Sequence, residues 1–158
     1  MFRKLLTTRS VCLSAMIAAL YAALTLLLAP ISYGAIQCRI SEAMTLLPLL
    51  LPQAIPGLAV GCLVANLLSP VAIWDVLFGT LATLLAAIGT YALRKKPLLA
   101  ALCPVVSNGL IVGAVLSIFY ALPLWLTMLQ VAVGEAAAVA LGFMLIHVLR
   151  RVDLSRFC

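Results

Sequence analysis

The run LWLTMLQVAVGEAAAVALGFMLIHVL, residues 124–149, decides the fold class of this chain. It contains one carboxylate, Glu135, and one imidazole, His147, among side chains that are otherwise almost all apolar. A helix needs about 20 apolar residues to cross a bilayer, and the run exceeds that length. Barrel strands alternate apolar and polar residues over about ten positions, whereas this run is continuously apolar. We therefore predict a membrane-spanning helix.

The rest of the chain has the same character. Of its 158 residues, 66% are hydrophobic and 9% are charged, and the mean hydropathy is +1.29. A soluble domain needs more polar surface than this composition provides. We predict one integral membrane domain over residues 1–158, an all-α bundle of six transmembrane helices. The predicted helices are 11–29, 43–51, 57–68, 72–93, 98–120 and 124–149.

The second and third of these helices are short. Pro52 and Pro56 lie at the break between them, and proline interrupts the hydrogen bonding of a helix. We expect these two helices to be tilted, packed inside the bundle or incomplete as spans.

Nine of the ten basic residues lie in three clusters, and the tenth is Arg39. Cytoplasmic loops of membrane proteins carry an excess of Lys and Arg, and six crossings would bring the three clusters to one side. We therefore predict a multi-pass protein of the cell membrane with both termini in the cytoplasm, and a first helix that is retained rather than cleaved as a signal peptide. This topology accounts for the net charge of +6 without a nucleic-acid partner. The clusters are Arg3, Lys4 and Arg9; Arg94, Lys95 and Lys96; and Arg150, Arg151 and Arg156.

Motifs for a cofactor, a metal or catalysis are missing from the sequence. The five cysteines form no Cys-x-x-Cys pair, and His147 is the one histidine. There is no phosphate-binding loop and no paired nucleophile and base. We expect no metal site, no cofactor and no enzymatic activity, so the energy for any transport must come from a partner or from an ion gradient.

Polar residues in the apolar segments are the candidate binding site, because such groups are expensive inside a bilayer. On the predicted topology they surround a cavity that faces outward. Asn108 and Glu135 lie at similar distances from the outer ends of their helices, at about 1.5 Å per residue, and could face each other. The candidates are Gln37, Arg39, Glu42, Asn66, Trp74, Asp75, Asn108 and Glu135.

Structural roles for single members of this set remain open. Glu135 could be protonated or paired with Arg39, Asp75 could cap a helix, and Asn108 could join two helices. The set as a whole favours a binding site, because it contains three carboxylates and one cation. A ligand that is basic or rich in hydrogen-bond donors would balance that charge.

The first helix has a face of small side chains. Ala15, Ala18, Ala19, Ala22 and Ala23 fall within an arc of about 140° when residues are placed at 100° intervals. Small residues let another helix approach closely. This face either packs within the bundle or docks another subunit, and Ala15, Ala19 and Ala23 are the candidate docking residues.

Taken together, these features resemble a known family. The stretch APISYGAIQCRISEAMTLLP (29–48), then Asn66, then DVLFGTLATLL (75–85), together with the alanine face, are similar to the QueT family. That family comprises queuosine-precursor S components, the substrate-binding subunits of energy-coupling factor (ECF) transporters.

The resemblance implies a six-helix protein without ATPase activity of its own. It would capture a 7-deazaguanine precursor outside the cell, join a transmembrane coupling subunit and two ATPases, and topple in the membrane to release the cargo inside. Glu42 or Glu135 would read the guanine-like edge, and Asp75 would take a ligand cation if there is one. Asn108 and Gln37 would meet the remaining ligand groups, and Trp74 would stack on the heterocycle.

Other functions remain open at this point. One is an S component for a different vitamin or a pyrimidine precursor. Another is a proton-coupled transporter that works alone, with Glu135 as the proton carrier. A structural subunit that binds no small molecule is a third.

Overall fold

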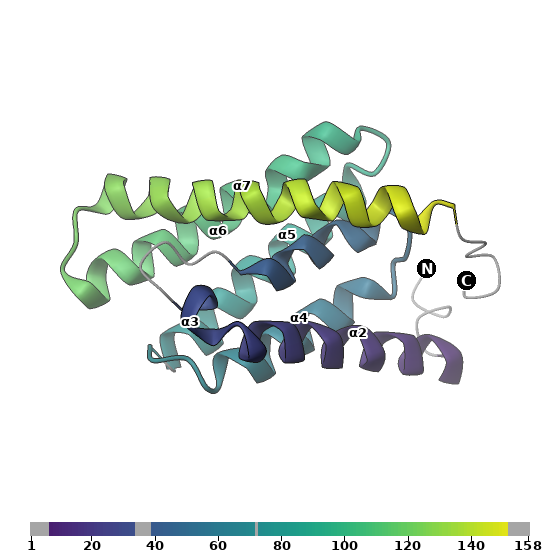
Figure 1. Ribbon diagram of the computed structural model, residues 1–158, viewed down its shortest axis with the longest axis horizontal. Coiled ribbons are helices and arrows are strands. Elements are labelled where there is room, and N and C mark those ends of the chain that lie inside the picture. The colour runs from purple at the N-terminus through teal and green to yellow at the C-terminus, as the bar shows by residue number, and fades with distance from the viewer. Residues whose placement is uncertain (1–6, 34–38, 72, 152–158) are drawn as a thin grey trace.

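The structure is a computed structural model that describes residues 7–33, 39–71 and 73–151. Its long helices form an elongated bundle in which some helices follow the long axis and others cross it obliquely (Figure 1). Among the described residues, four helical segments are long and apolar enough to cross a membrane. They are α2 (Thr8–Leu27), the continuous segment formed by the π-helix η2 (Asp75–Gly79) and α5 (Thr80–Ala92), α6 (Pro97–Tyr120) and α7 (Leu124–Leu149).

The remaining elements are shorter. They are α3 (Ala29–Ser32), the 3₁₀-helix η1 (Ile40–Leu49) and α4 (Ala54–Asn66). At about 2.0 Å per residue, the 10 residues of η1 extend over roughly 20 Å, less than the hydrocarbon core of a bilayer. The described part of the chain contains no β-strand, so the all-helical prediction is confirmed. The prediction that the second and third helices are short is also confirmed, whereas six complete crossings remain a prediction.

Local sequence explains several helix ends. The Thr7 side chain caps α2 by accepting a hydrogen bond from the backbone N–H of Ser10 at 3.3 Å. Pro97 occupies the first turn of α6, where its missing N–H costs nothing. Pro48 lies inside η1. In the structure, the predicted helix 43–51 is this 3₁₀-helix, and it begins three residues earlier than predicted, at Ile40.

The 3₁₀-helix η1 occupies the centre of the bundle. It contacts α2, α4, α5, α6 and α7, and every residue from Ser41 to Pro48 is buried. The long helices also pack on their neighbours, chiefly α6 on α7, α2 on α4 and α5 on α6. A side chain that η1 directs inward can therefore meet groups from all of these elements.

Glycines allow two of these helix pairs to approach closely. A Cβ atom added at Gly57 of α4 would lie 2.6 Å from the backbone oxygen of Ser14, and one at Gly61 would lie 2.7 Å from that of Ala18. In the same way, a Cβ atom at Gly113 of α6 would lie 2.7 Å from the Cα of Met128 in α7. The Gly-x-x-x-Gly pattern of α4 thus joins it to α2.

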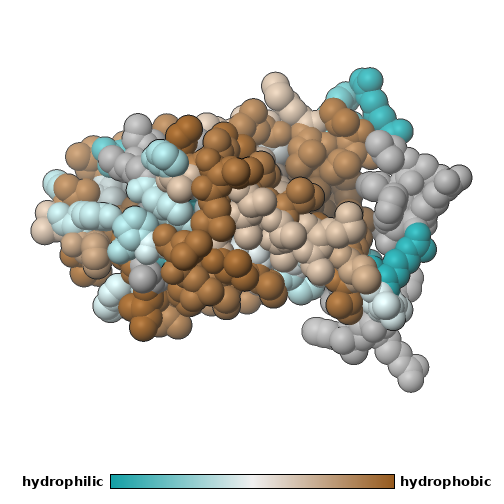
Figure 2. Space-filling model, turned by 60° about the horizontal axis from the view of Figure 1, so that its bottom comes forward, coloured by the Kyte–Doolittle hydropathy of each residue, from teal (hydrophilic) through white to brown (hydrophobic). Residues whose placement is uncertain are grey.

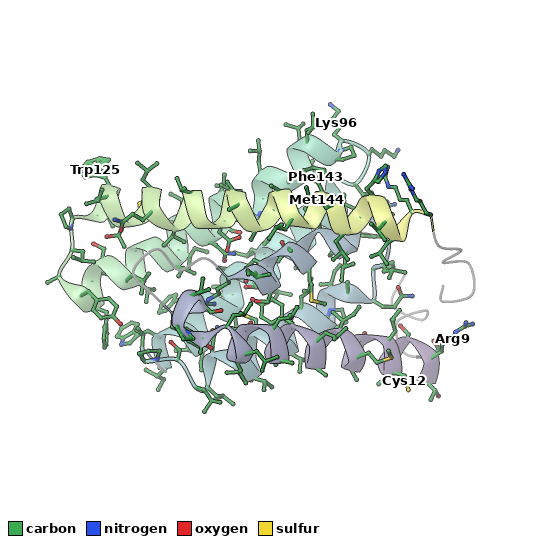
Figure 3. All side chains as sticks on the ribbon, in the orientation of Figure 1. Arg9, Cys12, Lys96, Trp125, Phe143 and Met144 are labelled. Carbon is green, nitrogen blue, oxygen red and sulfur yellow. The ribbon has the colours of Figure 1, made fainter. Side chains whose placement is uncertain are left out.

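Apart from Arg39, whose side chain is buried, basic residues from separate parts of the chain lie toward one end of the bundle. Arg9 and Lys96 lie toward the end at which α7 finishes, whereas Trp125 lies at the other end (Figure 3). A broad band of apolar side chains covers the middle of the molecule, and hydrophilic side chains gather toward the ends (Figure 2). This distribution fits a protein that spans a membrane along the long axis of the bundle.

The alanine face of α2 is divided between two environments. Ala18 and Ala22 are buried, and the backbone of Ala18 lies against α4. Ala15, Ala19 and Ala23 are exposed. One part of the face therefore packs within the bundle, and the other part is available to a partner.

Candidate functional site

Glu42 of η1 is held at the centre of the bundle by two hydroxyl groups. Its Oε1 atom accepts a hydrogen bond from the Tyr21 hydroxyl of α2 and another from Thr83 Oγ1 of α5, at 3.1 Å. The side chain is 1% exposed. Its second oxygen, Oε2, is also buried and has no hydrogen-bond partner among the described residues.

A polar chain continues from this point along α4. The Thr83 hydroxyl lies 3.3 Å from Cys62 Sγ, and Asn66 Nδ2 donates to the same sulfur at 3.2 Å. Asn66 Nδ2 also donates to the backbone oxygen of Asp75 at 2.8 Å. In the part of the chain that the structure describes, Asn66 Oδ1 is buried without a partner.

Asp75 and Arg39 form a buried ion pair. Arg39 Nη2 donates to Asp75 Oδ2 at 3.3 Å, and Ser69 Oγ donates to the same oxygen at 2.5 Å. The side chain of Asp75 is 1% exposed and that of Arg39 is 5% exposed. Within residues 7–33, 39–71 and 73–151, Asp75 Oδ1 and Arg39 Nε have no hydrogen-bond partner.

Tyr33 lies beside this ion pair. The Arg39 guanidinium lies 5.5 Å from the centre of the Tyr33 ring, in the range of a cation–π contact. The Tyr33 hydroxyl donates to the backbone oxygen of Ala65 at 2.7 Å. Partial burial raises the pKa of the Tyr33 phenol, so it stays a neutral donor at neutral pH.

Asn108 and Glu135 are joined across the interface between α6 and α7. Asn108 Nδ2 donates to Glu135 Oε1 at 2.6 Å, and both side chains are 3% exposed. The expectation that these residues face each other at similar depth is therefore confirmed. The Asn108 amide also lies beside Glu42, and the carboxyl groups of Glu42 and Glu135 are within electrostatic range of each other.

Most of the unpartnered polar atoms in these side chains are hydrogen-bond acceptors. Buried polar atoms are almost always hydrogen-bonded, and leaving one unpaired costs about 1–3 kcal/mol. Here four acceptor oxygens and one donor nitrogen lack a partner within the described chain. The arrangement suits a ligand that presents several N–H donors. The atoms are Glu42 Oε2, Asn66 Oδ1, Asp75 Oδ1, Glu135 Oε2 and Arg39 Nε.

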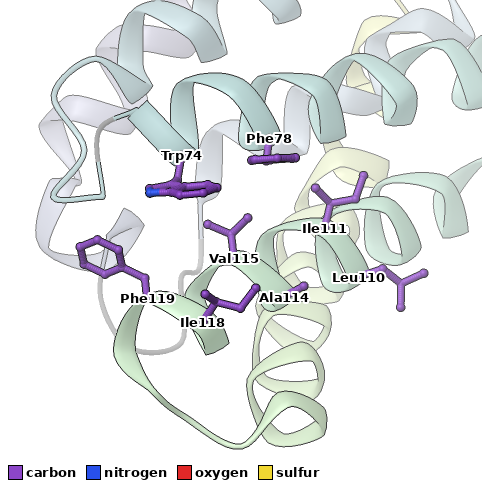
Figure 4. A pocket seen from close by; sticks show the side chains of 8 residues that line it. All are labelled: Trp74, Phe78, Leu110, Ile111, Ala114, Val115, Ile118 and Phe119. Carbon is purple, nitrogen blue, oxygen red and sulfur yellow. The ribbon is translucent and has the colours of Figure 1, made fainter.

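Trp74 has a different environment from the other candidates. Its side chain is 49% exposed, and its ring stacks on Phe78 with centroids 5.8 Å apart. Both rings line an apolar groove of about 620 Å³ between η2 and the second half of α6 (Figure 4). The other lining residues are Leu110, Ile111, Ala114, Val115, Ile118 and Phe119. Stacking of Trp74 on a ligand bound by Glu42 remains a prediction.

The structure thus brings Arg39, Asn66 and Asp75 together in one group, and Glu42, Asn108 and Glu135 in another. Gln37 lies outside the described residues. Sequence analysis missed four contributing residues: Tyr21, Cys62, Ser69 and Thr83. Tyr21 offered a signal, because it is a phenol in the middle of an apolar helix and its hydroxyl needs a partner. The described residues contain no group of three His, Cys, Asp or Glu side chains that could hold a metal ion.

Comparisons with known proteins give one match. A family model described as QueT transporter matches residues 11–151, which is most of the chain. No curated protein matches the chain, and no solved structure matches it. The matched range contains the central 3₁₀-helix, the alanine face and all of the candidate binding residues.

Proposed function

Since the chain belongs to the QueT transporter family, we propose that it is the S component of an ECF importer and captures a queuosine precursor outside the cell. Family membership makes it a transport protein, and the four segments long and apolar enough to span a membrane in the described part of the chain make it a multi-pass membrane protein. The cargo, the ECF partners and the direction of transport are the proposal.

The unpartnered acceptor oxygens support this cargo. A 7-deazaguanine presents adjacent N–H donors on its guanine-like edge, and a carboxylate can accept both. Asn66 and Asp75 each offer a free oxygen to such donors, and Glu42 and Glu135 offer two more at the centre of the bundle for the remaining donors of the ligand. Asn108, Arg39 and Gln37 complete the proposed site, and Trp74 is the candidate for stacking.

The exposed alanines support a partner in the membrane. Ala15, Ala19 and Ala23 leave a shallow surface on α2, on which a helix of a transmembrane coupling subunit could pack closely. We propose that this subunit links the protein to two ATPases, and that the protein itself hydrolyses no ATP. Toppling of the loaded protein would then release the cargo inside.

A titration of the purified protein tests the cargo. Isothermal titration calorimetry with 7-cyano- and 7-aminomethyl-7-deazaguanine should show binding with one ligand per chain. A panel of other vitamins and pyrimidine precursors should show none. Binding of a panel member without binding of a deazapurine would keep the transporter class and disprove the proposed cargo.

The second candidate function is a proton-coupled transporter that works without partner subunits. The buried carboxyl groups of Glu42 and Glu135 support it, because they could carry the coupled proton. The two functions predict different requirements for uptake into cells. An ECF subunit needs the coupling subunit and ATPases, and its uptake continues when an uncoupler collapses the proton gradient while ATP is maintained. A proton-coupled transporter needs no partner and stops with the uncoupler.

A further inference from the structure

The three buried carboxyl groups differ in how their charge is balanced. Asp75 is paired with Arg39. In the described chain, neither Glu42 nor Glu135 has an ion-pair partner. A ligand cation is therefore needed less at Asp75 than at the pair formed by Glu42 and Glu135.

The groups that face this pair come from every element around it. Tyr21 is a neutral hydrogen-bond donor to Glu42, and Arg39 acts on both carboxyl groups from a distance. Thr83 and Asn108 donate hydrogen bonds but do not titrate. The titratable or charged groups facing the pair are Tyr21 from α2, Arg39 before η1 and Cys62 from α4.

The two carboxyl groups have the same arrangement of oxygens. In each, Oε1 accepts hydrogen bonds from protein groups. In each, Oε2 is buried and lacks a partner in the described residues. Like charges at close range in a dry interior are strongly unfavourable, and carboxyl pairs in such sites commonly share a proton. The free Oε2 atoms are the places where that proton can bind without displacing a protein donor.

We propose that Glu42 and Glu135 share one proton in the ligand-free protein and exchange it for the cationic amino group of the ligand. The inference rests on the proposed function for the identity of the ligand. Within that class it selects the aminomethyl form, whose ammonium group has several N–H donors, over the neutral cyano form.

The exchange leaves unchanged the total charge of the two carboxyl groups together with the proton or ammonium bound to them. Before binding, the pair consists of one carboxylic acid and one carboxylate. After binding, it consists of two carboxylates, with the ligand ammonium donating to both Oε2 atoms, and the proton has passed to solvent. The positive charge of the ligand replaces that of the proton. A neutral ligand that displaced the proton would leave two unbalanced carboxylates in the interior, which is costly.

Calorimetry with 7-aminomethyl-7-deazaguanine tests the exchange. Titrations at neutral pH in two buffers of different ionisation enthalpy give the number of protons released, and we expect about one per bound ligand. Glu135→Gln has no shared proton, so it should bind more weakly and release almost none. Asp75→Asn should also bind more weakly but still release about one. The cyano form should bind wild type at least about tenfold more weakly than the aminomethyl form.

Three results would overturn the inference while leaving the proposed function intact. They are equal affinity for the two deazapurines, no proton release by wild type, and equal proton release by wild type and Glu135→Gln. Because protons compete with the ligand, affinity for the aminomethyl form should also fall as the pH falls.

A second measurement does not depend on the ligand. The infrared spectrum of the ligand-free wild type should contain the band of a protonated buried carboxyl group, and Glu135→Gln should lack it. If no deazapurine binds but this band behaves as expected, the proposed cargo is wrong and the shared proton stands. If wild type lacks the band, or the variant retains it, the shared proton is disproved.

Discussion

The side-chain amide of Asn108 donates a hydrogen bond of 2.6 Å to Glu135 and so joins α6 to α7 inside the bundle. Replacing Asn108 by Leu removes this donor and leaves both oxygens of Glu135 without a hydrogen-bond partner among the described residues. Asn108 is also a proposed ligand contact, so the variant should leave a buried polar group of the ligand unpaired. Such a loss costs about 1–3 kcal/mol, so ligand affinity should fall about ten- to a hundredfold. Calorimetric titration of the purified variant measures this change.

Ser107→Ala is the matched control for Asn108→Leu. The Ser107 hydroxyl donates to the backbone oxygen of Cys103 in its own helix, at 2.7 Å. Its removal should leave affinity unchanged. Equal affinities for wild type, Ser107→Ala and Asn108→Leu would show that Asn108 is a structural residue.

Removing one partner of the ion pair between Arg39 and Asp75 should destabilise the fold more than removing both. Arg39→Met leaves a buried carboxylate unpaired, and breaking such a pair costs about 3–5 kcal/mol. The double variant Arg39→Met with Asp75→Asn should recover much of that loss. Thermal unfolding in detergent, followed by tryptophan fluorescence, compares them. Arg150→Met changes an exposed arginine, and an equal loss of stability in this control would contradict the prediction.

The exposed alanines on α2 should be needed for transport and not for binding. Leu at both Ala15 and Ala19 adds bulk where a partner helix would pack, so uptake by cells that contain the complete importer should fall strongly. Calorimetry on the isolated variant should give the affinity of wild type. Ala137→Leu adds the same bulk at an exposed position on α7 and should leave uptake normal. Loss of binding in the α2 variant would instead indicate a packing role.

The basic end of the bundle should face the cytoplasm. A cysteine at position 95, introduced into a cysteine-free variant, should resist a membrane-impermeant thiol reagent applied to intact cells and react after the membrane is opened. A cysteine at position 125, at the opposite end of the molecule (Figure 3), should react in intact cells. The reverse pattern would invert the predicted topology.

The sequence predicted the helices well because apolar runs and prolines determine where they lie. Pro52 marked the break after the central segment, whereas Pro56, also expected at that break, lies in the first turn of α4. The 3₁₀ form of η1 was not predicted. Its backbone geometry depends on the helices packed around it, and a run such as 43–51 does not distinguish the two kinds of helix.

The candidate site was predicted in part. Rarity of polar groups in apolar segments identified Glu42, Asn108 and Glu135, which the structure brings close together. Which of these polar side chains contact one another could not be predicted, since this depends on which helices are neighbours. Asp75 was assigned to a ligand cation, whereas its side chain is paired with Arg39. Tyr21 was not among the candidate residues, yet it donates to Glu42.

The division of α2 into two environments limits which mutations this helix can tolerate. Ile17, Ala18, Tyr21 and Ala22 are buried against the bundle, and Ala15, Ala19 and Ala23 form the proposed docking surface. Met16 and Leu20 are exposed and belong to neither set. Saturation mutagenesis scored by growth on an external precursor should therefore show a repeating pattern in α2. Positions 16 and 20 should accept most apolar residues, and the alanines around them should accept little beyond glycine and serine.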